Sequence, residues 1–266
     1  MTIPELHAKL YDILCMVDDI CKKEGVRYFL DGGTEIGSVR EKDFIAWDDD
    51  LDIKVLREDY DAFKAAMIKN LPDKFKFIEP EEFSPYFYDF VPRVIDTTDN
   101  LRAVTDEDKA YKNYQNCVGF DVFILENAPA GKLAQKMMLL KLKTIYGMAM
   151  SKRYKVNKEK YSFVQKLVTA VCGAMGKLFS LKKIFKMWNK SMRKYNGKPT
   201  GYVIPVNFPL QFISIFKREW YETAAQGEIK GRKFPSPAGY DAEMTQIYGD
   251  YMKPPADKSI YTTHLD

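Results

Sequence analysis

Four aspartates crowd into the five positions 48–52, directly before the mostly apolar stretch 53–56. If the chain forms a β-strand from Asp50 to Val55, alternate side chains share a face, so Asp50 and Asp52 project together while Leu51 turns to the core. Neighbouring carboxylates repel each other and are costly to bury without a cation. Mg²⁺ prefers such oxygen ligands, with Mn²⁺ as the alternative, so the run predicts a metal site.

A calcium loop and a solvated turn are the competing interpretations of these acids. A calcium loop that begins at Asp48 needs glycine at its sixth position and glutamate at its twelfth, where the chain has Ile53 and Asp59. The calcium loop is therefore excluded. A solvated acidic turn stays open as the alternative, although an apolar strand does not usually follow such a turn.

A third acid and a glycine-rich turn complete the candidate site. Asp121 is the lone carboxylate in the otherwise apolar run Gly119–Phe123. Three acids carried on strands can hold two ions that clamp the attacking and leaving oxygens of a phosphoryl transfer. Gly32-Gly33-Thr34 follows the strand expected at 26–30 and opens a short helical stretch. Glycines let the backbone approach an anion, and helix N-terminal amides bind phosphate.

The periodicity of apolar residues predicts an α+β fold, with a mixed β-sheet flanked by helices. Helices are expected at 3–24, 35–40 and 58–69, with Gly25 ending the first and a loop at 31–34 preceding the second. Strands are expected at 26–30, 50–55, 75–78, 86–95 and 117–124. We predict a catalytic core at 1–130, a basic helical insertion at 131–198, and a C-terminal segment at 199–266 that packs back on the core.

The charge of the chain is unevenly distributed. Residues 131–198 contain 18 lysines and arginines and the single acid Glu159, a net charge of +17. Because the whole chain carries +4, the remainder carries −13. An acidic body interrupted by a basic helical segment fits contact with a membrane surface or an anionic glycan precursor, with an ordinary solvated hairpin as the alternative. We do not expect nucleic acid binding, because no recognition motif is present.

Other residue counts exclude several classes of protein. The two histidines, His7 and His264, are too few for a Ser-His-Asp triad or a histidine-rich zinc site. The four cysteines form no CxxC pair, which favours reduced thiols. The N-terminus lacks the features of a signal peptide, and the longest apolar stretch, 167–175, is too short to span a membrane. We therefore expect a cytoplasmic protein, with peripheral contact at the inner face of the cell membrane left open.

The motifs resemble those of the LicD family, which includes bacterial phosphocholine transferases and relatives of the fukutin type and has the nucleotidyltransferase fold. The resemblance extends over the glycine-rich stretch, the acidic run, the second acidic strand and a C-terminal motif: Gly32–Arg40, Phe44–Ile53, Phe120–Phe123, Tyr240–Asp241 and Thr245–Met252. It implies transfer of a phospho-alcohol, phosphocholine first of all, from a CDP-linked donor to a hydroxyl of a cell-surface glycan such as a teichoic acid or a lipopolysaccharide, with CMP as the other product.

The resemblance also implies roles for individual residues. Asp50, Asp52 and Asp121 would bind the metal ions, and Asp121 could take the proton of the acceptor hydroxyl. Asp48 would either be a further ligand or, preferably, orient its neighbours. The remaining residues would bind substrate, with the arginines neutralising the transferred phosphoryl group: Gly32, Gly33, Thr34, Gly37, Ser38, Arg40, Trp47 and Arg93.

Two other functions stay open at this point. A nucleotidyltransferase would move a nucleoside monophosphate to a sugar phosphate or a protein with the same residues. A binding module without catalysis would use the fold to hold a lipid or a glycan. If the cargo is choline, its quaternary ammonium group needs an aromatic face or an acid nearby. The candidates are Trp47, Tyr86, Phe87, Tyr88, Tyr248 and Tyr251.

Overall fold

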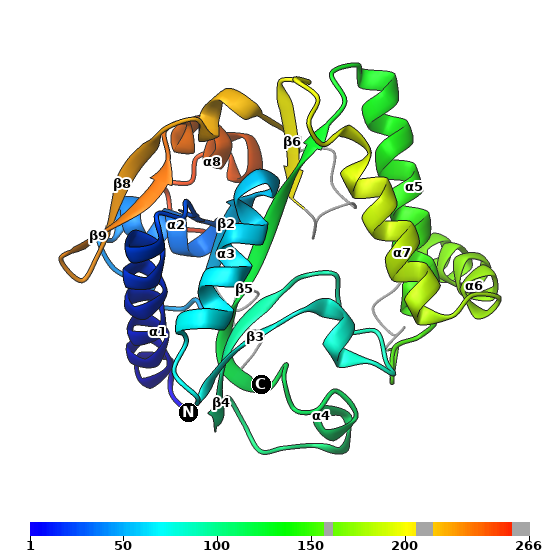
Figure 1. Ribbon diagram of the computed structural model, residues 1–266, viewed down its shortest axis with the longest axis horizontal. Helices are drawn as coiled ribbons and strands as arrows, with labels where there is room; N and C mark the ends of the chain where they lie inside the picture. Colours follow the sequence, from blue (N-terminus) through cyan, green and yellow to red (C-terminus); the bar gives the residue numbers. More distant parts are fainter. Residues whose placement is uncertain (157–161, 206–214, 257–266) are drawn as a thin grey trace.

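The computed structural model describes residues 1–156, 162–205 and 215–256. It shows a mixed α+β fold in which a curled sheet is flanked by helices (Figure 1). The fold class predicted from the sequence is confirmed. No helix within the described ranges is long and apolar enough to cross a membrane.

Seven strands of the described chain form the main sheet, and β5 (Cys117–Ala128) is its longest member. One edge of β5 pairs in parallel with β2 (Asp52–Leu56), which is antiparallel to β1 (Phe29–Leu30). The other edge pairs with β4 (Arg93–Asn100) near its beginning and with β6 (Tyr202–Pro205) near its end, both antiparallel. The strands β3 (Phe75–Ile78) and β7 (Phe216–Lys217) extend β4 and β6, and β8 (Ala224–Ile229) and β9 (Arg232–Pro237) form a separate hairpin.

Helices cover the sheet and build a lobe at its side (Figure 1). The first helix, α1 (Ile3–Glu24), begins with a capping box between Thr2 and Glu5 and ends at Gly25, whose φ of 69° is left-handed. It packs beside α3 (Arg57–Asn70) through the apolar residues that the spacing predicted. The lobe consists of α5 (Lys132–Met150), α6 (Phe163–Lys177) and α7 (Leu181–Met192). The remaining helices are α2 (Gly32–Arg40), α4 (Asp106–Ala110) and α8 (Tyr240–Tyr248), with short 3₁₀ turns at 80–83, 193–195 and 218–221.

Three expectations about the elements are wrong in detail. The second helix begins before residue 35, because the Asp31 side chain caps it at the amide of Gly32 and α2 begins there. The aromatic run 86–92 is not a strand. Its rings pack into the core and into a cluster around Phe83 and Tyr111, and β4 begins only after Pro92. Asp50 precedes β2, which begins at Asp52.

The C-terminal segment expected at 199–266 lies partly outside the described residues, at 206–214 and 257–266. Within the described part, β6 and β7 join the main sheet beside β5. The hairpin of β8 and β9 packs against α2 and β1, and α8 packs against α2. Segments that are distant in sequence therefore surround α2, and this arrangement builds the cavity described next.

Candidate active site

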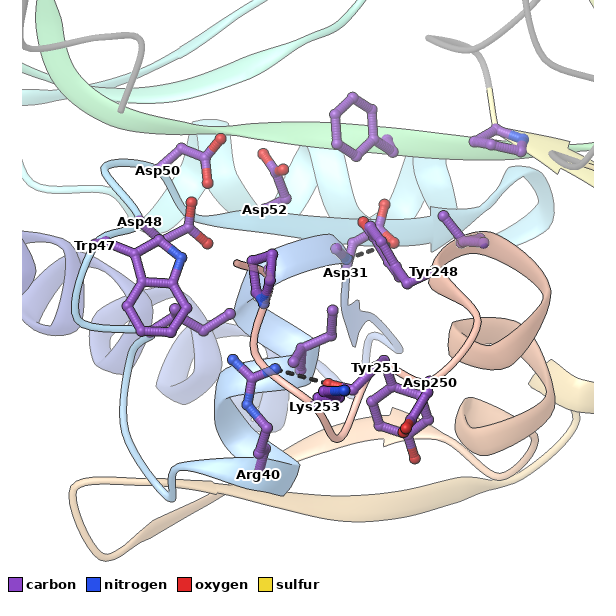
Figure 2. Close-up of a pocket in the computed structure, with 18 of the residues that line it drawn as sticks. Asp31, Arg40, Trp47, Asp48, Asp50, Asp52, Tyr248, Asp250, Tyr251 and Lys253 are labelled. Atoms are coloured by element: carbon purple, nitrogen blue, oxygen red, sulfur yellow. Dashed lines mark hydrogen bonds between the residues drawn. The ribbon is translucent and has the colours of Figure 1, made fainter. Parts of the chain in front are cut away.

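A cavity of about 460 Å³ opens between α2, the acidic run and the segment from α8 to residue 255 (Figure 2). Its lining combines acids, cations and aromatic rings: Asp31, Gly32, Gly33, Ile36, Arg40, Ile45, Trp47, Asp48, Asp50, Asp52, Phe123, Pro205, Phe216, Ile247, Tyr248, Asp250, Tyr251, Lys253 and Pro255. The glycine-rich stretch and the acidic run, predicted as parts of one site, thus face the same space.

The acidic side of the cavity is held by backbone contacts. The amide of Asp52 donates to Oγ1 of Thr34 at 3.0 Å, and the amide of Asp31 donates to the carbonyl of Asp52 at 3.0 Å. The carbonyl of Asp48 lies 2.7 Å from Nε2 of His7. Leu51 is fully buried, so the alternation expected from the sequence still turns Asp50 and Asp52 away from the core, although the strand starts later.

Burial and the neighbouring carboxylates raise the pKa of Asp48 and of Asp52. The pKa of Asp48 is raised to about 8, first by burial and then by the charge of Asp50 and a hydrogen bond with it. The pKa of Asp52 is raised well above its ordinary value, first by burial and then by the charges of the neighbouring acids: Asp50, Asp121, Asp31 and Asp48. None of the ion pairs in the described part of the chain includes Asp48 or Asp52. A divalent cation would reduce the repulsion between these carboxylates.

Gly33 is required by close approach, and Gly32 by its left-handed backbone conformation. A Cβ on Gly33 would lie 1.9 Å from Oδ2 of Asp48, so no larger residue fits while that carboxylate keeps its place. Gly32 has a φ of 52°, and a Cβ there would lie 3.6 Å from Oδ2 of Asp52 and 3.7 Å from the hydroxyl of Tyr248. The first turn of α2 therefore presents its backbone directly to the acids.

Arg40 and Lys253 give the cavity a cationic side, which lies across from the acidic run in Figure 2. Arg40 donates from Nη1 to the carbonyl of Tyr251 at 2.6 Å and pairs through Nε with Glu41 at 2.7 Å. Its Nη2 is buried and has no hydrogen-bond partner among the described residues. Its guanidinium lies 5.9 Å from the ring centre of Trp47. A buried donor of this kind is suited to an anionic ligand group.

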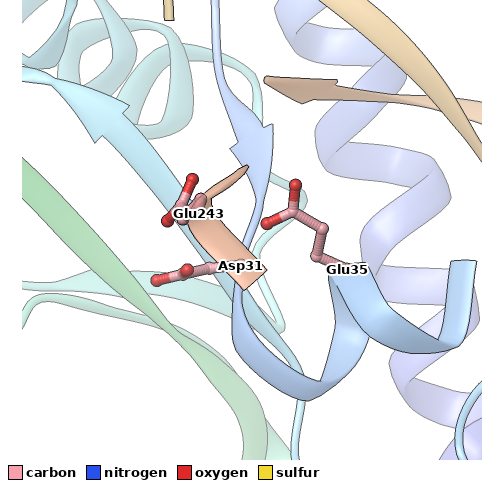
Figure 3. A group of neighbouring side chains, drawn as sticks. All are labelled: Asp31, Glu35 and Glu243. Carbon is pink, nitrogen blue, oxygen red and sulfur yellow. The ribbon is translucent and has the colours of Figure 1, made fainter. Parts of the chain in front are cut away.

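A second acidic cluster lies beside the cavity, and it surrounds a lysine. Asp31 and Glu35 come from the start of α2 and Glu243 from α8, and their ligand atoms lie within 4.8 Å of one another (Figure 3). The ammonium of Lys54 contacts all three carboxylates, at 3.0, 2.9 and 2.6 Å respectively. This buried lysine already supplies a cation to the three carboxylates, so a metal ion in the same place would meet the charge of the ammonium group.

Asp121 and Arg93 form an adjoining pair rather than part of the cavity lining. Asp121 is in register with Asp52 across the parallel strands β2 and β5, so both side chains share one face. Nε of Arg93 lies 2.7 Å from Oδ1 of Asp121. Asp121 is thus brought next to Asp52, as the sequence suggested, while Arg93 acts on that carboxylate and not on the cavity.

Gly37 and Ser38 are not brought to the cavity. The hydroxyl of Ser38 donates to the carbonyl of Glu35 at 2.8 Å and is packed under Gly227 of β8. A Cβ on Gly37 would lie 2.5 Å from the carbonyl of Asp43, so this glycine serves the packing of α2 against that loop. Thr34 is buried and supports Asp52 instead of lining the cavity.

Sequence reasoning missed Asp31, Lys54, Glu243 and Lys253. The motif around Gly32 gave one available indication, since an aspartate directly before a helix is a common N-cap. A lysine inside a buried strand was the other, because a buried ammonium group requires acidic partners. The identity of a partner 189 positions away, Glu243, could not be read from either pattern.

The capped glycine turn and the acidic run both lie in a segment that resembles a known family. Residues 25–91 match the family model described as LicD/FKTN/FKRP, nucleotidyltransferase domain. The match includes both the glycine-rich turn and the aspartates.

Individual relatives extend this likeness. The chain is 25% identical over 269 residues to the lipopolysaccharide cholinephosphotransferase LicD of Haemophilus influenzae, an alignment that covers 100% of this chain and 97% of that protein. An uncharacterized protein of Rickettsia prowazekii is 36% identical over 50 residues, 19% of each chain. The resemblance to the LicD family seen in the motifs is therefore confirmed.

Proposed function

We propose that this protein transfers a phospho-alcohol, phosphocholine first of all, from a CDP-linked donor to a hydroxyl of a cell-surface glycan. The observation that carries the proposal is a single cavity that sets Asp48, Asp50 and Asp52 opposite Arg40 and Lys253. The acids suit a divalent cation and the cations suit the phosphates of a donor. The full-length likeness to a cholinephosphotransferase that is named for lipopolysaccharide supports the choice of cargo and acceptor.

The acidic side is proposed to hold Mg²⁺, with Mn²⁺ as the alternative. The donor set fits, because several carboxylates face one cavity, and burial together with their mutual repulsion raises the pKa of Asp48 and Asp52. A bound ion would supply electrostatic stabilisation of the charge that develops on the transferred phosphoryl group. Asp50 and Asp52 are the proposed ligands, and Asp48, fixed above Gly33, supports them or adds a third oxygen.

The chain's own residues would position the reactants. The first turn of α2 and the free Nη2 of Arg40 would bind the diphosphate, and Lys253 would add positive charge at the same end of the cavity. Asp121, held by Arg93 beside Asp52, is the proposed acceptor of the proton from the attacking hydroxyl.

Three aromatic residues of the cavity remain as candidates to receive the alcohol: Trp47, Tyr248 and Tyr251. A quaternary ammonium group is bound by aromatic faces. Phe87 is fully buried in the core, and Tyr86 and Tyr88 pack with the cluster around Phe83. We therefore keep three of the six aromatic residues considered from the sequence as candidates for this role.

A thermal-shift panel tests the proposal. The full chain is titrated with CDP-choline, other CDP-alcohols, CTP and ATP, each with and without Mg²⁺. We expect stabilisation by cytidine diphosphates that requires the metal ion, and its loss in Asp52→Asn. Asp106→Asn is the matched control, because Asp106 is exposed on α4. Indifference of the wild-type chain to every CDP-alcohol would contradict the proposal.

Product analysis separates the proposal from its alternatives. Incubation with CDP-choline, Mg²⁺ and a glycan precursor should release CMP and label the glycan with phosphocholine. A nucleotidyltransferase would instead release pyrophosphate from CTP and leave CMP on the acceptor. A binding module without catalysis would hold the glycan with no product from either nucleotide.

A further inference from the structure

Helix α6 exposes its large apolar side chains. Leu167, Val168, Val171, Met175 and Leu178 are all exposed, and Leu178 reaches 80%. Because these positions recur at intervals of three and four residues, they form one face of the helix and its end. A helix in a globular protein normally turns such a face to the core. The large apolar side chains of α6 point to the solvent instead.

The inner face of α6 carries small residues instead. A Cβ on Gly176 would lie 2.2 Å from the carbonyl of Met148, and one on Gly147 of α5 would lie 2.7 Å from Cβ of Cys172. These contacts bring α5 and α6 into close backbone approach, as small residues do between helices in membranes. The exposed apolar face is thus a consequence of how α6 docks on α5, with its small residues turned inward.

The neighbouring helix exposes apolar side chains as well. Leu133, Met137 and Leu140 are exposed along one stripe of α5, with spacing of four and three residues. We call the five exposed residues of α6 and its end the apolar face of the lobe. In Figure 1, α6 is the outermost element on this side, and α2 and α8, which line the cavity, lie on the opposite side of the view.

Positive charge frames this apolar face. No acid or base interrupts the stretch 167–176, and Lys166 and Lys177 stand at its two ends. The segment 131–198 as a whole carries +17. An exposed apolar stripe between lysines suits the boundary between anionic headgroups and acyl chains. A second copy of the chain is a poor occupant, because two such segments would repel each other.

We propose that the apolar face of the lobe lies on an anionic lipid bilayer, with α6 parallel to the membrane plane. Ten uncharged residues of helix span about 15 Å, half of the roughly 30 Å hydrocarbon core, so the helix rests in the interface and does not cross. The apolar side chains enter the acyl region while Lys166 and Lys177 contact lipid phosphates. The proposal concerns binding alone and does not depend on the transfer reaction.

Vesicle sedimentation tests the proposal with the full chain. We expect binding to phosphatidylcholine vesicles that contain phosphatidylglycerol, weak binding to phosphatidylcholine alone, and a decrease with added salt. The triple variant Leu167→Gln, Val171→Gln and Leu178→Gln should bind roughly tenfold more weakly or worse, because it removes three apolar side chains from the interface. Ile68→Gln is the matched control, since Ile68 is 65% exposed on α3 and should not contact lipid.

Tryptophan reporters locate the contact. Fluorescence of Val171→Trp should shift to the blue and be quenched by brominated acyl chains, whereas that of Ile68→Trp should not. Circular dichroism of each variant is the check that its fold is kept. Equal vesicle binding by the triple variant and the wild type would overturn the proposal. So would a concentration-dependent dimer that the triple variant abolishes, because a second copy would then cover the apolar face.

Discussion

Lys54→Met is the perturbation for which the structure gives the clearest expectation. Lys54 is fully buried, and its ammonium lies within 3.0 Å of a carboxylate oxygen of each of Asp31, Glu35 and Glu243. Burial alone would lower the pKa of Lys54, but the three acids together raise it well above its ordinary value. Methionine keeps the length of the side chain and removes the charge, so the acids would be left without a counter-ion.

The magnitude follows from the burial of these groups. Removing one partner of a buried ion pair costs about 3–5 kcal/mol, because the remaining charge is buried without compensation. A domain has about 5–15 kcal/mol of stability in total, so the change removes a large share of it. With a slope of about 3 kcal/mol per M, the midpoint of urea unfolding should fall by about 1–2 M.

Urea unfolding followed by circular dichroism is the assay, with Lys76→Met as the matched control. Lys76 pairs with Glu82 at 3.1 Å, but its side chain is 45% exposed, and such pairs contribute only about 0–1 kcal/mol. A fall in midpoint no larger for Lys54→Met than for Lys76→Met would refute the reasoning.

A second variant separates charge from packing. Burial raises the pKa of Glu35 well above its ordinary value, against the opposing effect of Lys54. Once Lys54 is gone, Glu35 and the other acids only repel one another. Adding Glu35→Gln to Lys54→Met should therefore restore part of the lost stability. No recovery would mean that the loss comes from packing and not from uncompensated charge.

Three further perturbations address the cavity. Gly33→Ala should abolish the thermal shift caused by Mg²⁺, because its Cβ would displace the Asp48 carboxylate, whereas Gly131→Ala, with nothing within 4 Å of the new Cβ, should leave the shift intact. Arg40→Gln should lower kcat/KM for CMP release by roughly 10–100-fold, the loss of one charge-assisted hydrogen bond of about 1.5–3 kcal/mol; an unchanged value would remove Arg40 from donor binding. Because Asp48 has a pKa of about 8 in the folded chain, the metal-free protein binds a proton that the unfolded chain releases. Its free energy of unfolding, followed by denaturation in EDTA at a series of pH values, should therefore fall as the pH rises from about 4 to about 8. Added Mg²⁺ should remove that fall, and a flat profile without metal would contradict it.

Local sequence patterns predicted the helices that bury one face and expose the other to solvent. The apolar residues of α1 and α3 repeat at helical spacing because each helix has a single face against the sheet. The run 86–92 misled the prediction because aromatic residues favour burial as much as they favour strands. The hairpin of β8 and β9 went unpredicted, since Ala224–Ile229 and Arg232–Pro237 lack a regular alternation and the second contains two prolines.

Some residues of the candidate site could be predicted from the sequence and others could not. The acidic run and the glycines were visible in the sequence, since close carboxylates and residues without a Cβ have few uses other than binding a cation and approaching a ligand. Ser38 was misplaced because it belongs to the same short motif as Gly33 but lies on the buried side of α2, under Gly227. Sequence proximity on a helix says little about direction unless the start of the helix is known, and the start was set by the Asp31 cap.

The C-terminal segment links both sides of the cavity. On the acidic side, Glu243 of α8 binds Lys54, two residues along β2 from Asp52, and the Tyr248 hydroxyl lies beside Gly32. On the cationic side, the carbonyl of Tyr251 accepts a hydrogen bond from Arg40. Because one short stretch makes all three contacts, its docking orders the acids and the arginine together. The C-terminal motif therefore belongs to the site for a physical reason, although none of these three residues needs to take part in the chemistry.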